Sequence, residues 1–133
     1  TMPRYAHADV LDNGVKYIKD NCNKVILISA YSTAYATVNG ANKVAEAALV
    51  TGDFAITGAD GAARTLTATL TGKSGGNALQ GVADGTNMHL AFVDTVNSKV
   101  LYVTEESSDQ AIINGNPVQF NSNPTYTSGQ PTA

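Results

Sequence analysis

The side chains that most often perform chemistry in proteins are sparse in this sequence of 133 residues. There are two histidines, His7 and His89, and a single cysteine, Cys22. Neither histidine has another histidine two or four residues away, so a zinc site would need carboxylates from distant parts of the chain. Cys22 cannot form a disulfide within the chain, and no histidine or basic cluster lies near it. We therefore interpret Cys22 as a small buried residue rather than a reactive thiol.

One motif of nucleotide-binding proteins is present only in part. Residues 72–74 (Gly-Lys-Ser) follow a predicted strand, as they do at the end of a phosphate-binding P-loop. However, Thr67 occupies the position of the first glycine, and residues 75–77 (Gly-Gly-Asn) do not begin a helix whose amides hold a phosphate. We therefore do not expect nucleotide binding. A Ser-His-Asp arrangement built from distant segments stays open, because its members need not be adjacent in sequence.

The acidic residues form no recognisable catalytic pair or ion site. Glu105 and Glu106 are adjacent at the end of a predicted strand, where neighbouring side chains point to opposite faces, so we interpret them as solvated charges. Four aspartates stand at predicted turns, where Asp commonly bonds its own backbone: Asp53, Asp60, Asp84 and Asp94. None has the alternating ligands of a calcium loop. We therefore expect no catalytic residues, no cofactor and no bound metal.

An amphipathic helix from about residue 9 to residue 21 is predicted near the start of the chain. Leu11, Val15, Ile18 and Cys22 recur at spacings of four, three and four, which places them on one apolar stripe. Gly14 weakens this helix by about 1 kcal/mol relative to alanine. We therefore expect the helix to be held by docking on a sheet rather than by its own propensity.

The rest of the chain shows the period of two that is typical of β-strands. Residues 24–29 are apolar on both faces, which predicts a strand covered on both sides, with the helix on one of them. The clearest hairpin joins residues 88–93 to residues 99–104. Further predictions are strands at 53–57, 64–71 and 117–120, a polar loop at 31–43, a helical turn or short strand at 44–50, and a Gly-rich loop or weak edge strand at 72–85. This pattern predicts an antiparallel β-sandwich or small barrel with one N-terminal α-helix.

We expect a single β-rich domain over residues 1–120, followed by an extended C-terminal arm over residues 121–133. A chain of this size can bury one modest core without a metal or a disulfide. The arm is predicted because the sequence after Phe120 has neither charge nor periodicity.

Charged residues make up 14% of the sequence, against about 25% in ordinary soluble domains. The net charge of −3 and the pI near 5.1 argue against nucleic-acid binding, which needs a clustered basic face. No apolar run approaches the roughly 20 residues of a membrane-spanning helix. Uncharged stretches concentrate at residues 31–40, at 72–82 with Lys73 as the exception, and at 112–133. This distribution is typical of neutral segments that make contacts in an assembly.

The predicted contact residues lie in these uncharged stretches. Tyr31 and Tyr35 flank the polar loop and Tyr126 lies in the expected arm, and tyrosine is enriched at protein interfaces. For Tyr31 and Tyr35, ordinary packing at the edge of the core is an equal alternative. The full set of expected interface residues is Tyr31, Tyr35, Asn121, Pro124, Tyr126 and Pro131.

Several segments together carry a family resemblance. They are the helix leading into residues 24–30, Asp53-Phe54 before residues 61–67, and residues 89–94 followed by residues 97–104. This order of segments resembles a group of small structural proteins of tailed bacteriophages. The resemblance covers about residues 8–120 and contains no catalytic motif. After Phe120 the sequence departs from the pattern of the group, which continues into another hydrophobic strand.

The resemblance implies a structural protein of a phage virion, located on the capsid surface. A capsid decoration or cement protein is the role we expect, with the major capsid protein and further copies of itself as partners. A trimer at a symmetry axis is one such form. Such a role needs no catalysis, no nucleic acid and no membrane. The alternatives are a phage tail or neck component, and a carbohydrate-binding β-sandwich module, although the chain contains no Trp.

Overall fold

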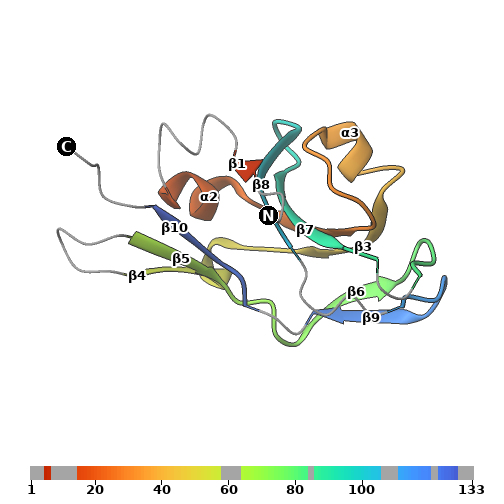
Figure 1. Cartoon of the computed structure of the whole chain (residues 1–133). Coiled ribbons are helices and arrows are strands. Elements are labelled where there is room, and N and C mark those ends of the chain that lie inside the picture. The colour runs from red at the N-terminus through yellow and green to blue at the C-terminus, as the bar shows by residue number, and fades with distance from the viewer. Residues whose placement is uncertain are drawn as a thin grey trace.

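The computed structural model describes residues 5–6, 15–57, 64–83, 86–105, 111–120 and 123–128, and the fold is mainly β (Figure 1). The helices are α2 (Val15–Asn21), α3 (Tyr35–Val38) and the 3-10 turn η1 (Thr51–Asp53). The strands are β1 (Tyr5–Ala6), β2 (Lys24–Ile28), β3 (Lys43–Ala48), β4 (Phe54–Thr57), β5 (Arg64–Ala68), β6 (Lys73–Asn77), β7 (His89–Asp94), β8 (Lys99–Glu105), β9 (Pro117–Phe120) and β10 (Thr125–Ser128).

Five antiparallel strands form the larger sheet, sheet A, in the order β1-β8-β7-β2-β3. The hairpin of β7 and β8 is the one that the sequence predicts, and it pairs Phe92 with Tyr102. The carboxylate of Asp94 closes the turn, because it accepts hydrogen bonds from the backbone N–H groups of Val96 and Asn97. Asp94 is buried and bonds its own backbone, as expected for a turn aspartate.

The second layer consists of sheet B, with the order β10-β5-β4, and sheet C, with the order β6-β9. Strands β5 and β6 follow each other in the chain, and so do β9 and β10, so the two pairs form one bent antiparallel ribbon. At the bend, the Asn123 side-chain oxygen accepts hydrogen bonds from Leu70 N at 3.0 Å, Thr71 N at 3.2 Å and Thr71 Oγ1 at 2.9 Å. Asn123 therefore connects the two halves of the ribbon, sheets B and C, at the bend where strand-to-strand backbone hydrogen bonds are interrupted.

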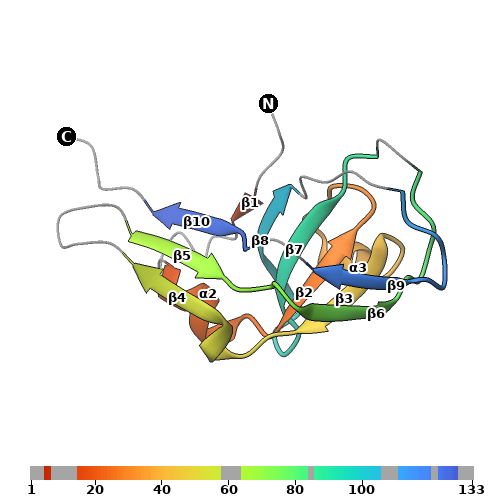
Figure 2. The same cartoon turned by 90° about the horizontal axis from the view of Figure 1, so that it is seen from below.

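The main core lies between sheet A and the second layer. In Figure 1 sheets B and C lie below sheet A, and in Figure 2 they lie side by side in front of it. Helix α2 contributes Ile18 to this core and contacts sheet B, and Cys22, directly after the helix, is buried in the same core. Gly75 of β6 sits so close to β3 that a Cβ there would lie 2.9 Å from Ala45 Cβ and 3.1 Å from the Phe120 ring. Glycine at residue 75 therefore allows sheet C to pack closely on β3 without a steric clash.

The opposite face of sheet A carries a second apolar cluster. Its buried members are Ile26, Ile28, Val38, Ala91, Val93, Val100 and Val103, with Tyr35 packed against them. Helix α3 covers part of this face (Figure 1). Strand β2 therefore has buried side chains on both faces, as its continuous apolar sequence predicts.

The structure confirms the mainly antiparallel β architecture and changes several local predictions. Helix α3 lies inside the segment expected to be a polar loop at 31–43, because burial of Val38 on sheet A stabilises a turn that its sequence alone favours weakly. Residues 43–48 form a strand, which decides between the two predictions for 44–50. The N-terminal part of the helix expected from residue 9 lies outside the described residues.

The extended arm predicted over residues 121–133 is wrong for its central part. Thr125–Ser128 forms β10, which pairs with β5 along its whole length. Tyr102 Oη donates a hydrogen bond to the Thr125 carbonyl at 2.6 Å, so β10 is also tied to sheet A. The local sequence does not reveal this strand because its partner, β5, lies about 60 residues earlier in the chain. Residues 121–122 and 129–133 lie outside the described residues.

Candidate functional site

Cys22 is buried in the main core, as the sequence predicts. Its Sγ donates a hydrogen bond to the Lys24 carbonyl at 3.5 Å. Burial raises the pKa of the Cys22 thiol to about 12, against hydrogen bonds with the backbone of Lys24 and Val93 that lower it. Because the thiolate is the nucleophile, a thiol with this pKa is unreactive near neutral pH.

Residues 72–76 (Gly-Lys-Ser-Gly-Gly) fit the spacing Gly-x-Ser-x-Gly of the nucleophile turn in serine hydrolases, a match that the sequence analysis missed. That motif requires a sharp turn between a strand and a helix. Here Ser74 lies within β6, paired with Gln119, and its Oγ accepts a hydrogen bond from Gly76 N at 3.2 Å. His89 lies in β7 of sheet A, beside Ile28 of the second apolar cluster. Ser74 is therefore a strand residue without the geometry of a nucleophile.

The burial of His89 is a feature that the sequence analysis did not predict. It is 2% exposed, and neither ring nitrogen has a hydrogen-bond partner among the described residues. The ring of Tyr31 stands edge-on to it, with ring centroids 5.5 Å apart and an angle of 66° between the planes. Glu105 is the residue opposite His89 on β8, and its Oε2 is also buried without a partner. The prediction that Glu105 is a solvated charge is therefore wrong for this oxygen.

These residues do not amount to a metal centre. Within the part of the chain that the structure describes, no group of three or more His, Cys, Asp and Glu side chains is placed to hold a metal ion. No helix among the same residues is long and apolar enough to cross a membrane.

The predicted contact residues fall into three environments. Tyr31 is 38% exposed and lies over His89, whereas Tyr35 packs against the second apolar cluster. Tyr126 is half-buried against the main core, with its ring 5.1 Å from that of Tyr102. Tyr31 and Tyr35 therefore neighbour the same face of sheet A, while Tyr126 is part of the fold.

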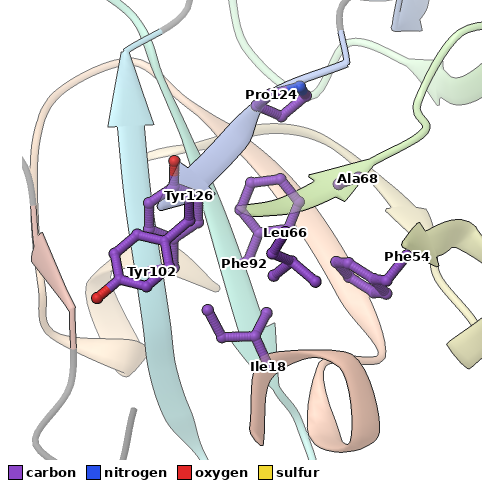
Figure 3. A pocket seen from close by; sticks show the side chains of 8 residues that line it. All are labelled: Ile18, Phe54, Leu66, Ala68, Phe92, Tyr102, Pro124 and Tyr126. Carbon is purple, nitrogen blue, oxygen red and sulfur yellow. The ribbon is translucent and has the colours of Figure 1, made fainter. Parts of the chain in front are cut away.

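Pro124 and Tyr126 line a small apolar pocket at the end of the main core. Figure 3 shows side chains from α2, β4, β5, β7, β8 and β10 converging on it. The lining residues are Ile18, Phe54, Leu66, Ala68, Phe92, Tyr102, Pro124 and Tyr126. The space between them does not admit a water molecule, so these side chains pack closely against one another. Asn121 and Pro131, the other expected interface residues, lie outside the described residues.

Most of the residues that form the outer strands of the second layer are uncharged. Residues 74–83 and 111–128 contain no Asp, Glu, Lys, Arg or His. The outward side chains of β5, β6, β9 and β10 are mainly hydroxyl and amide groups, including those of Thr65, Thr67, Ser74, Gln119 and Thr125. We call this surface, formed by the outer side of β5, β6, β9 and β10, the neutral face (Figure 2). The cation of β6, Lys73, is paired with Asp53 at 3.1 Å.

Two large apolar side chains are exposed at one end of the neutral face. Leu79 is 58% exposed and Ile113 is 66% exposed. They lie on two facing segments, 78–82 and 112–116, which we call the double loop. Backbone hydrogen bonds join these segments at both ends, between Val82 and Ile112 and between Ala78 and residues 115–116. The double loop is therefore a fixed platform that presents two apolar groups.

Charged side chains gather instead on sheet A. Glu46 of β3 forms ion pairs with Lys24 and with Lys43, the latter at 2.6 Å. Burial opposes the ionisation of Glu46, but hydrogen bonds and charges from the two lysines outweigh it and lower the pKa of this carboxyl group. The low charge content of the chain is therefore not spread evenly over the structure. Charged side chains lie along the β3 edge of sheet A, and uncharged side chains form the neutral face.

Comparison with protein-family models, with curated proteins and with solved structures finds no significant match to this chain. The assignment of a function therefore rests on the residues and their arrangement.

Proposed function

We propose that this chain is a structural protein of a tailed-phage virion, acting as a capsid decoration protein that binds the capsid through its neutral face. The observation that carries the proposal is the neutral face with Leu79 and Ile113 exposed at its end. The resemblance of residues 8–120 to small phage structural proteins supports the same role. The double loop belongs to this contact surface, whereas Tyr31 lies over His89 on the opposite, α3-covered face of sheet A.

An uncharged surface suits repeated assembly for a physical reason. Charged side chains are depleted at the centres of protein interfaces, because each must lose its hydration when the interface forms. Hydroxyl and amide groups keep hydrogen-bonding capacity at a smaller desolvation cost. If copies of the chain are joined in an oligomer, each copy can make a small contact and the oligomer still remains bound, because linked contacts bind with avidity.

The experiment introduces one carboxylate into the double loop and measures binding to phage particles that were produced without this chain. We expect Leu79→Asp and Ile113→Asp each to weaken binding at least tenfold, because the new charge would be buried on contact. Val96→Asp is the matched control, since Val96 is 82% exposed in the turn between β7 and β8, outside the neutral face. All three variants replace an exposed residue and should keep the fold.

Equal binding by all three variants and the unchanged protein would remove the double loop from the contact surface. Failure of the unchanged protein to bind any particle of its own phage would contradict the proposed function itself.

A further inference from the structure

An interface on the neutral face does not explain why His89 and the Oε2 atom of Glu105 are buried without hydrogen-bond partners among the described residues. The two residues are direct partners in the β7–β8 ladder, next to Ile28 in the order β8-β7-β2. Side chains at directly opposite positions of an antiparallel pair point to the same face and start about 5 Å apart. Both groups therefore share one small region on the α3-covered face of sheet A.

His89 is buried, and so is the Oε2 atom of the otherwise half-buried Glu105, without the hydrogen bonds that buried polar atoms normally make. His89 Nδ1 and Nε2 and Glu105 Oε2 have no partner among the described residues. An unsatisfied buried polar group is destabilising, because it has lost its hydration without gaining a hydrogen bond. Native proteins rarely keep such groups, and those that occur commonly mark a bound water or ion.

We propose that His89 and Glu105 form a binding site for one internal water molecule, which bridges the imidazole and the carboxylate. A water molecule can donate to Glu105 Oε2 and, at the same time, exchange a hydrogen bond with a ring nitrogen of His89. An ion is a poorer occupant, because the described residues supply no cluster of three His, Cys, Asp or Glu ligands. Water suits the site because one molecule can both donate and accept hydrogen bonds.

Tyr31 closes this site towards solvent. Its ring contacts the His89 ring edge-on at 5.5 Å and is itself 38% exposed, whereas His89 is 2% exposed. An aromatic side chain in this position excludes bulk water while leaving the inner polar atoms in place. The bridging water then exchanges slowly, at a rate set by movement of Tyr31.

The test is a crystal structure of the whole chain at a resolution that shows ordered water, together with water–protein NOE measurements on the His89 ring. We expect one water within 3.2 Å of both a His89 nitrogen and Glu105 Oε2. Replacement of Tyr31 by alanine should shorten the residence time of that water at least tenfold. Tyr35→Ala is the matched control and should leave the residence time unchanged, because Tyr35 is the first residue of α3 and packs against the second apolar cluster.

A direct hydrogen bond between His89 and Glu105, or an ion at this position, would overturn the proposal. So would a dry site. A second measurement uses His89→Leu, Glu105→Leu and the double variant. A shared water predicts that the double variant loses clearly less in Tm than the sum of the two single losses, since neither orphaned group remains. Additive losses would contradict a shared ligand. These outcomes do not depend on particle binding, so they separate this proposal from the proposed function.

Discussion

The replacement of Asn123 by alanine tests whether the last strand is an integral part of the fold. Asn123 Oδ1 accepts hydrogen bonds from Leu70 N, Thr71 N and Thr71 Oγ1 at the bend of the ribbon. The two bonds from Thr71 lie in an exposed setting, where water can replace them, whereas the bond from Leu70 N is partly buried. Loss of the buried bond and partial loss of the others costs about 1–2 kcal/mol.

This cost corresponds to a decrease in Tm of roughly 4–8 °C for a chain of this length. Thermal unfolding followed by circular dichroism measures it, with chemical denaturation as a second assay. Asn123→Asp is the rescue variant, because the oxygen acts only as an acceptor and a carboxylate can replace it. Asn114→Ala is the control, since Asn114 is exposed in the double loop. A Tm unchanged within 1 °C in Asn123→Ala would refute the account of the bend.

The remaining predictions concern the C-terminus, the packing of sheet C and the ion pairs of β3. Deletion of residues 121–133 should abolish stable folding in thermal unfolding followed by circular dichroism, because it removes β10 and the Thr125 carbonyl that accepts a hydrogen bond from Tyr102. Gly75→Ala should lower the Tm by several degrees, because its Cβ would meet Ala45 at 2.9 Å, while Gly52→Ala should not, since nothing lies within 4 Å. Glu46 has a pKa below its usual 4.5, so its contribution to stability is present above about pH 4.5 and is lost as the pH falls through the lower folded value. Glu46→Gln should therefore flatten the loss of stability on acidification in a pH series of denaturation curves, and an unchanged acid profile would contradict this.

Much of the fold can be predicted from local sequence. The alternation over β7 and β8 and the turn between them are local signals, and both strands form where the pattern indicates. The apolar run of β2 also predicts correctly that it is covered on two sides. These features depend on neighbouring residues, which is why a single sequence contains enough information to find them.

Features that depend on distant partners could not be found in the same way. Strand β10 is polar and short, and it forms because β5 offers a free edge and Tyr102 offers a hydroxyl. Helix α3 exists because Val38 finds an apolar face to cover. Neither partner is visible in the local pattern, so tertiary context overrides the weak local preference.

The burial of His89 could be predicted from local sequence, whereas its pairing with Glu105 could not. His89 has the same parity on β7 as Ala91 and Val93, which belong to the second apolar cluster, so the alternation already places His89 on a buried face. The same alternation does not show that β8 pairs Glu105 directly with His89. The register of the hairpin, with its irregularity between Phe92 and Val93, is needed for that conclusion.

A cryo-EM reconstruction of the phage particle that contains this chain tests the central claim most directly. The proposal predicts many copies at regular positions on the outer capsid lattice, each with β6, β9 and the double loop towards the capsid. A few copies at the neck or tail, or copies that face the capsid through the charged edge around Glu46, would contradict it.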